Sequence, residues 1–169
     1  MIDAYATSPA PTTVNLACFK IGDATYALEV ECVREIVRMA EIAPLPNSPE
    51  LIEGVIDLRG SLIPVLDLAR VLGRGEGRSD SRARVAVLDF SGLVFGLWVD
   101  SATQVLNLDA SRLEDLPDLA THAGYDAVSS MVRREGESPV MVLSLDSVVE
   151  SIYRSAPSRA SVGEPTQCQ

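Results

Sequence analysis

The sequence predicts an all-β fold with a few short helices, arranged as two repeated groups of five short strands. Apolar stretches of strand length follow one another at close intervals and are separated by glycine and proline. No segment shows the long period of an amphipathic helix, and the second half of the chain repeats the pattern of the first. Two small barrels are therefore expected in place of a parallel sheet.

The two halves open with matching hairpins. In the first half, the apolar strand from Leu16 to Ile21 is followed by a Gly22-Asp23 turn and by "YALEVE" at residues 26–31. In the second half, the strand from Val85 to Phe90 is followed by a Ser91-Gly92 turn and by "FGLWVD" at residues 95–100. The two return strands agree position by position, which predicts a duplicated fold.

The two halves also close alike, with a strand that runs into a short helix. Asp67 is the expected N-cap in "PVLDLARVLG", and Ser144 is the expected N-cap in "VMVLSLDSVVES". The apolar helix faces are expected to carry Leu68, Val71 and Leu72 in the first half and Leu145, Val148 and Val149 in the second. Pro64 has no backbone N–H, so it predicts an edge position or a bulge in its strand.

One ordered domain is expected over residues 14–153, divided into halves of about 14–72 and 83–153. The linker between them, "GRGEGRSDSR" at residues 73–82, contains three glycines and no apolar residue. Residues 1–13 and 154–169 are expected to be flexible tails, because both are rich in small and polar residues without periodicity.

The chain is acidic, with 24 acidic and 14 basic residues and a formal net charge of −10. A surface of this sign repels phosphate backbones, and the sequence contains no basic stripe, so no nucleic-acid partner is expected. The N-terminal "MIDAYATSPAPTT" lacks the basic start and apolar stretch of a signal peptide. The uncharged run "FSGLVFGLWV" is about half the ~20 residues that a membrane-spanning helix needs. A cytoplasmic protein without membrane insertion is expected.

The residue types that enzymes use are sparse. His122 is the single histidine and lies in a polar stretch, where solvation is its usual state. Cys18, Cys32 and Cys168 form no C-x-x-C pair, which argues against a metal site and fits a reducing compartment. Phosphate-loop, dinucleotide and G-x-S-x-G motifs are absent as well. We expect no catalytic residue, no metal and no cofactor.

Two features keep alternatives open. The acidic stretch "LDASRLEDLPDL" holds Asp109, Glu114, Asp115 and Asp118, which could form a carboxylate pair for acid–base chemistry or a cation site. The plainer interpretation is a short turn capped by Asp109 or Ser111, with its acids facing water. Trp98 is either a buried neighbour within a sheet or an exposed aromatic residue for binding a partner.

The stretch "GVIDLRGSLIPVLDL" at residues 54–68 resembles the signature of the CheW family of chemotaxis coupling proteins, in which G-x-x-N-x-R-G precedes x-x-P-x-x-D-L. Four further stretches are similar to the family in the same order, and together they cover about residues 14–153: "FKIGDATYALEVECVREI", "PLPNSPELIEGV", "VFGLWVDSATQVLNL" and "VMVLSLDSVVE".

The resemblance implies two five-stranded barrels, similar to SH3-type barrels, packed on a shared apolar core. It implies a non-catalytic adaptor that links the regulatory domain of a CheA-type histidine kinase to the cytoplasmic tip of methyl-accepting chemoreceptors. Such adaptors act in signalling arrays at the inner face of the membrane. An adaptor of a non-flagellar pathway that binds only one of these partners is the alternative.

The resemblance also assigns partner-binding residues. Arg59 corresponds to the family's turn arginine, framed by Gly54 and Gly60 and next to Asp57. Val33 and Glu35 would lie on the partner-binding surface of the first half, and Ala102 and Val105 would help to form the groove for the receptor tip.

The charges of the signature allow two interpretations. Asp57 and Arg59 either pair with each other at an exposed turn, or Arg59 reaches a partner while Asp57 orients it. The chain departs from the family pattern at Asp57, where asparagine is usual, at Ser101, and in "DAVSSMV" at residues 126–132, where glycines are frequent. These departures leave open which partners are bound.

Overall fold

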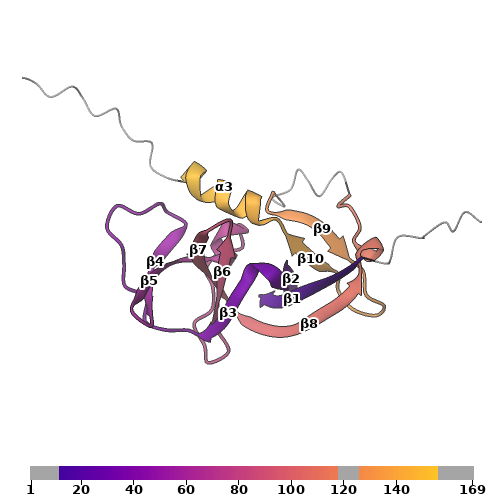
Figure 1. Ribbon diagram of the computed structural model, residues 1–169, viewed down its shortest axis with the longest axis horizontal. Coiled ribbons are helices and arrows are strands. Elements are labelled where there is room, and N and C mark those ends of the chain that lie inside the picture. Colours follow the sequence, from indigo (N-terminus) through magenta and orange to yellow (C-terminus); the bar gives the residue numbers. More distant parts are fainter. Residues whose placement is uncertain (1–11, 118–125, 156–169) are drawn as a thin grey trace, which may run out of the picture.

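The computed structural model of the chain describes residues 12–117 and 126–155, which fold into ten strands and a few short helices (Figure 1). The strands of the first half are β1 (Thr13–Ile21), β2 (Ala24–Glu29), β3 (Val33–Arg38), β4 (Ile52–Leu58) and β5 (Ser61–Asp67). Those of the second half are β6 (Arg84–Phe90), β7 (Leu93–Val99), β8 (Ser101–Asp109), β9 (Val128–Val132) and β10 (Val140–Leu143). The fold class is therefore confirmed as mostly β.

The helices are short and capped as expected. α1 (Leu68–Val71) follows β5, and the Asp67 carboxylate accepts the Ala69 N–H at 3.0 Å. α3 (Leu145–Ser155) follows β10, and the Ser144 hydroxyl accepts the Ser147 N–H at 3.3 Å. Two single-turn 3₁₀ helices, η1 (Val30–Cys32) and η2 (Ala110–Arg112), follow β2 and β8.

The ten strands form two five-stranded sheets of identical topology. Sheet A has the order β8-β1-β2-β10-β9, and sheet B has the order β3-β6-β7-β5-β4. Each sheet combines the opening hairpin of one half with the last three strands of the other half. Each also contains one parallel pair, β2 with β10 in sheet A and β7 with β5 in sheet B. The two SH3-like units are thus interleaved, and no sheet is built from one half alone.

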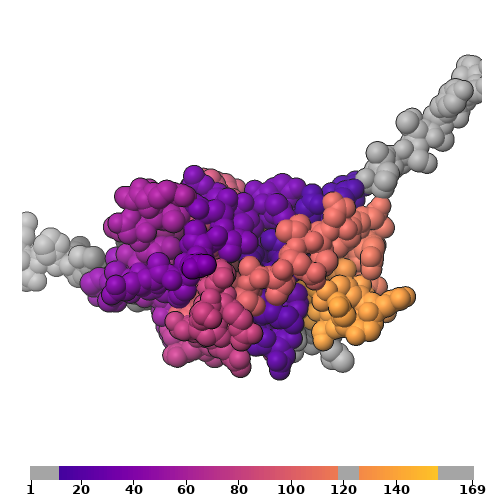
Figure 2. All heavy atoms as spheres, turned by 90° about the horizontal axis from the view of Figure 1, so that it is seen from below, coloured from indigo at the N-terminus to yellow at the C-terminus, as the bar shows by residue number. Residues whose placement is uncertain are grey.

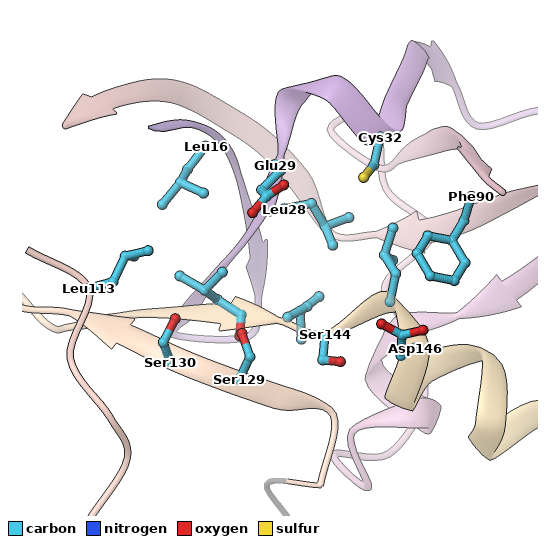
Figure 3. A pocket seen from close by; sticks show the side chains of 13 residues that line it. Leu16, Leu28, Glu29, Cys32, Phe90, Leu113, Ser129, Ser130, Ser144 and Asp146 are labelled. Carbon is cyan, nitrogen blue, oxygen red and sulfur yellow. The ribbon is translucent and has the colours of Figure 1, made fainter. Parts of the chain in front are cut away.

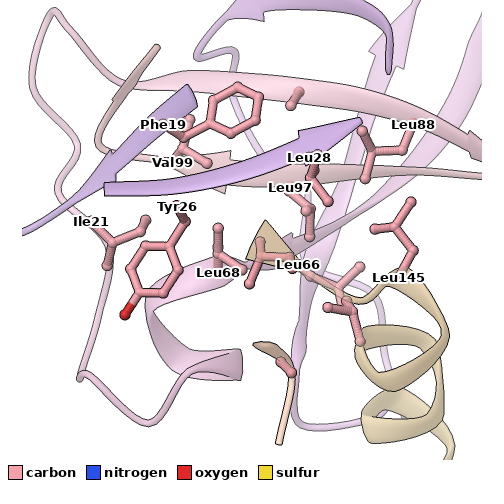
Figure 4. Close-up of a cluster of buried hydrophobic side chains, with 14 of the residues drawn as sticks. Phe19, Ile21, Tyr26, Leu28, Leu66, Leu68, Leu88, Leu97, Val99 and Leu145 are labelled. Carbon is pink, nitrogen blue, oxygen red and sulfur yellow. The ribbon is translucent and has the colours of Figure 1, made fainter. Parts of the chain in front are cut away.

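A shared apolar core lies between the two sheets (Figure 4). Phe19, Tyr26 and Leu28 enter it from sheet A, while Leu88 and Leu97 enter it from sheet B, and all are at most 2% exposed. The alternate residues of the same strands fill a smaller core within each sheet. Strands buried on both faces show continuous apolar runs instead of alternation, which explains the sequence of β1.

Pro64 occupies a position that its missing N–H allows. β5 lies inside sheet B between β7 and β4, but its pairing with β7 covers only Val65 to Asp67. Pro64 lies just before that segment and faces Val55 of β4. At this residue, β5 therefore has a strand neighbour on one side only.

The segment from 73 to 82 is held on the surface by hydrogen bonds to both sheets. The Arg74 guanidinium donates to the Tyr26 hydroxyl of sheet A at 2.9 Å, and the Gly77 N–H donates to the buried Asp67 carboxylate at 2.7 Å. Asp100 accepts the N–H groups of Gly22 and Arg78 at 2.7 and 2.9 Å. None of the helices within residues 12–117 and 126–155 is long and apolar enough to cross a membrane.

Candidate partner-binding surfaces

The turn between β4 and β5 is stabilised by Asp57. Arg59 and Gly60 both adopt positive φ, at 51° and 87°, as the two central residues of a type I′ hairpin turn do. The Asp57 carboxylate accepts the Gly60 N–H at 2.8 Å. The turn between β6 and β7 repeats this arrangement, with Asp89 accepting the Gly92 N–H at 3.1 Å. The acid of the signature therefore fixes the backbone from which Arg59 projects.

Arg59 forms an ion pair with Glu35 of β3. Among the described residues no ion pair joins Arg59 to Asp57, so the interpretation of a simple Asp57–Arg59 pair is wrong. The Arg59 side chain is 73% exposed and that of Glu35 is 30% exposed. The pair borders a cavity of about 480 Å³, which is also lined by Arg34, Leu58, Ser61, Ile63, Val87 and Val94. The structure thus brings Glu35, Asp57, Arg59 and Gly60 together at one end of sheet B.

Gly54 is buried and has a packing role. A Cβ atom at this position would lie only 2.2 Å from the Ala43 carbonyl oxygen. The neighbouring Val55 exchanges two backbone hydrogen bonds with Ala43, at 2.8 and 2.9 Å. Gly54 therefore allows the 39–51 loop to approach β4 and is not itself part of the exposed surface.

Val33 and Ala102 occupy equivalent positions on equivalent edge strands. Val33 of β3 lies opposite Leu88 of β6, and Ala102 of β8 lies opposite Phe19 of β1. In the repeat, β3 corresponds to β8 and Leu88 corresponds to Phe19. The residues predicted to bind partners therefore lie on corresponding edge strands, β3 in sheet B and β8 in sheet A.

Val105 and Ile36 also correspond to each other in the repeat. Val105 lies opposite Ala17 of β1, and Ile36 lies opposite Ala86 of β6. Val105 is 63% exposed and Ile36 is 42% exposed. Reasoning from the sequence missed Ile36, although its alignment with Val105 in the repeat could have found it. Figure 2 shows β8, in salmon, crossing the exposed face beside the purple atoms of the first half. Neither Ala102 nor Val105 lines the cavity next to Arg59.

The acidic stretch is structural where it is described. Asp109 accepts the Ser111 N–H at 2.9 Å, and this backbone hydrogen bond lowers the pKa of Asp109. The Glu114 carboxylate accepts hydrogen bonds from Nε and Nη2 of Arg133 at 2.8 and 3.0 Å. Asp118 and His122 lie outside the described residues. Within the described ranges no group of three His, Cys, Asp or Glu side chains could hold a metal ion.

Trp98 is half-buried, and its indole N–H donates to the Arg78 carbonyl at 3.1 Å. It therefore packs beneath the linker, which favours the interpretation of a neighbour within the fold. Cys18 is buried and Cys32 is half-buried, and desolvation raises the pKa of both thiols. Cys168 lies outside the described residues.

A sequence model of the CheW-like domain matches residues 15–153, which is most of the chain. The chain belongs to the CheW-like family. "Chemotaxis protein CheW" of Rhizobium meliloti is 29% identical over 142 residues, covering 84% of this chain and 91% of that protein. "Protein FrzA" of Myxococcus xanthus is 31% identical over 145 residues, covering 84% and 89%.

A solved CheW structure agrees with the fold. The scaffolding protein TtCheW from Thermoanaerobacter tengcongensis superposes with a TM-score of 0.71 at 27% identity, covering 79% of this chain and 90% of that one. CheW-like proteins are scaffolds and not enzymes, so this chain is a non-catalytic chemotaxis coupling adaptor.

The departures from the CheW pattern leave the backbone intact. Ser101 pairs with Lys20 at the start of β8, and Ser130 pairs with Val142 of β10. Neither serine, nor Ser129, has a positive φ, so no glycine is required at these positions. Ser130 corresponds to Gly54 in the repeat, since Gly54 faces Val65 in the same way.

Proposed function

We propose that this CheW-like protein couples the regulatory domain of a CheA-type histidine kinase to the cytoplasmic tip of methyl-accepting chemoreceptors. The observation that carries the kinase contact is the position of Arg59. Its guanidinium is largely exposed on a turn whose backbone is fixed by Asp57, so it reaches solvent at low conformational cost.

Arg59 and Glu35 together present a donor and an acceptor at the rim of an open cavity. Opposite charges on a partner would set the register of docking and accelerate association. Because the intramolecular pair is exposed to solvent, exchanging it for intermolecular pairs costs little, about 1 kcal/mol or less.

The receptor contact is supported by the apolar side chains on the edge strands. Val105 and Ala102 of β8 and Ile36 of β3 are exposed. An amphipathic helix binds to a surface of this kind through its apolar face. We assign the receptor tip to this apolar surface and the kinase domain to the Arg59 end of sheet B.

The test is a calorimetric titration of the full chain with the C-terminal regulatory domain of a CheA-type kinase. Arg59→Glu is expected to weaken binding at least tenfold. Arg154→Glu reverses another exposed arginine that pairs with a glutamate, and it is expected to bind as the wild type does. Equal binding by wild type and Arg59→Glu would reject the Arg59 contact, and an absence of binding would reject the kinase as a partner.

A parallel titration uses a soluble receptor cytoplasmic fragment. Val105→Glu places a charge on the apolar surface and is expected to abolish measurable binding. Tyr153→Glu changes an exposed aromatic residue on α3 and serves as the matched control. Binding to only one of the two, the kinase domain or the receptor fragment, would identify an adaptor with a single partner.

A further inference from the structure

A second cavity, of about 260 Å³, opens between the ends of β2 and β6, strands β9 and β10, and the first turn of α3 (Figure 3). Its floor is formed by buried apolar side chains, including Leu16, Leu28 and Leu143. Its polar lining comprises the carboxylates of Glu29 and Asp146 and the hydroxyls of Ser129, Ser130 and Ser144. Pockets for drug-sized ligands measure about 300–1,000 Å³, so this smaller cavity suits an inserted side chain or a short peptide.

The repeat identifies the corresponding place in sheet B. In sheet A, β10 pairs with β2 so that Val142 lies opposite Ala27, and in sheet B, β5 pairs with β7 so that Val65 lies opposite Gly96. Two residues further along the chain from each of these, Ser144 and Glu29 take the places that Asp67 and Trp98 take in sheet B.

In sheet B the protein's own linker fills this place. The Gly77 N–H donates to the Asp67 carboxylate at 2.7 Å, and the Trp98 indole donates to the carbonyl of Arg78 at 3.1 Å. A Cβ atom on Gly77 would lie 2.8 Å from Asp67 Oδ1 and 3.2 Å from Trp98 Cε2, so the linker backbone is in tight contact with both side chains. Main-chain hydrogen bonds therefore hold an irregular peptide segment between Asp67 and Trp98.

In sheet A none of the described segments fills the corresponding place, and its polar side chains are of a different kind. Glu29 stands at the N-cap position of η1 but makes no side-chain capping bond. Neither Glu29 nor Asp146 has an ion-pair partner within residues 12–117 and 126–155. Asp146 lies in the first turn of α3, where the helix dipole favours a negative charge. The cavity thus offers two carboxylates where sheet B offers a carboxylate and an indole.

We propose that this cavity binds a short peptide segment of a partner protein through an arginine or lysine side chain. The aliphatic stem of that side chain lies on the apolar floor, and its cation meets Glu29 and Asp146. The peptide N–H groups next to it donate to the oxygens of the rim, as Gly77 donates to Asp67 in sheet B. The net charge of −10 further favours a basic partner.

This site is separate from the coupling contacts. None of its lining residues belongs to the β4–β5 turn or to β8, so a peptide bound there leaves the surfaces proposed for the kinase and the receptor uncovered. The adaptor would then carry a third protein, or a third segment of one partner, next to the other two.

The test is an NMR titration of the full chain with the capped peptide Ala-Gly-Arg-Gly-Ala, and with the same peptide carrying citrulline in place of arginine. Citrulline keeps the shape of arginine and removes its charge. The arginine peptide is expected to produce saturable shifts centred on Glu29, Cys32, Ser130 and Asp146 at millimolar or lower concentration. The citrulline peptide is expected to bind about fivefold or more weakly.

Variants locate the charges. Glu29→Gln combined with Asp146→Asn is expected to weaken the arginine peptide by about fivefold or more. Glu41→Gln combined with Glu50→Gln makes the same change in net charge on the exposed 39–51 loop and is expected to leave binding unchanged. An absence of shifts at the cavity, or equal binding by the two double variants, would overturn the proposal. Tighter binding by full-length Arg159→Gln would assign the site to the protein's own arginine and would also overturn it.

Discussion

Arg59, on the turn between β4 and β5, is paired with Glu35, on β3, across a sequence separation of 24 residues. β4 and β3 are the two outer strands of sheet B, so this pair links its opposite edges. Arg59 also has a φ of 51°, a backbone conformation that most residues other than glycine and asparagine adopt at an energetic cost. An exposed ion pair does not offset such a cost by much, which favours a role for Arg59 in binding over one in stability.

Arg59→Asn separates these two roles. Asparagine suits the positive φ of a type I′ turn and has no guanidinium. We expect the free energy of unfolding to stay within about 1 kcal/mol of the wild-type value. Binding to the kinase domain should fall at least tenfold. Chemical denaturation and calorimetry measure the two quantities.

Ser91→Asn is the matched control, because Ser91 has a φ of 52° and also precedes a glycine in the similar turn between β6 and β7. Both stability and binding should be retained in that variant. A large loss of stability on Arg59→Asn alone would instead place Arg59 among the structural residues.

Gly54→Ala is expected to lower the free energy of unfolding by about 3 kcal/mol. The new Cβ would meet the Ala43 carbonyl oxygen at 2.2 Å, and relief of that overlap would break the backbone bonds between Ala43 and Val55. Urea denaturation measures the loss. Ser130→Ala changes the corresponding position of the other half and should cost less than about 1 kcal/mol. Similar losses in the two variants would contradict the packing role of Gly54.

Asp67→Asn tests the buried carboxylate beneath the linker. Burial raises the pKa of Asp67, and this effect outweighs the N–H groups of Gly77 and Ala69, which lower it. Compared with the unfolded chain, the folded state therefore favours the protonated form of Asp67. The stability that this preference contributes is complete below the unfolded pKa of about 3.9, and it is lost as the pH rises through the higher folded pKa.

The stability of the wild type relative to Asp67→Asn should accordingly decrease as the pH is raised above about 4. Urea denaturation of both proteins across this range measures the difference. A difference that grew with pH would show that the hydrogen bonds outweigh burial, and a constant difference would show that the two effects cancel; either would contradict the raised pKa.

Phe19→Ala is expected to destabilise both sheets together. Phe19 belongs to sheet A, is fully buried, and lies in the core that the sheets share. Its truncation should cost about 3–5 kcal/mol. Trp98 is the single tryptophan and lies in sheet B, so its fluorescence reports on the sheet that was not mutated. The unfolding transition followed by Trp98 fluorescence should coincide with the one followed by far-ultraviolet circular dichroism. Separate transitions would refute a common core.

Local features of this fold were predictable from the sequence. The opening hairpins, the caps Asp67 and Ser144, and the apolar helix faces depend on residues within a few positions of one another. The order of strands in each sheet was not predictable in this way. It depends on contacts such as that of β2 with β10, between residues more than a hundred positions apart, which no local pattern specifies.

The candidate site shows the same division. The position of Arg59 followed from the family signature, but its pairing with Glu35 needed the closed sheet. Asp57 was expected to pair with or orient Arg59 through charge, whereas it acts through the Gly60 N–H. The glycines of residues 73–82 predicted a linker between the halves, and the structure adds that Gly77 fits between Asp67 and Trp98.

The exchange of strands between the halves makes this molecule the single-chain counterpart of an intertwined dimer. A cut within residues 73–82 would leave one fragment with two strands of sheet A and three of sheet B, and the other fragment with the complement. Neither fragment could close a sheet without the other. The stability of the severed protein would then depend on its concentration, as it does for an obligate dimer. The glycine-rich segment that joins the halves therefore keeps the two complementary pieces at a fixed one-to-one ratio in every copy of the adaptor.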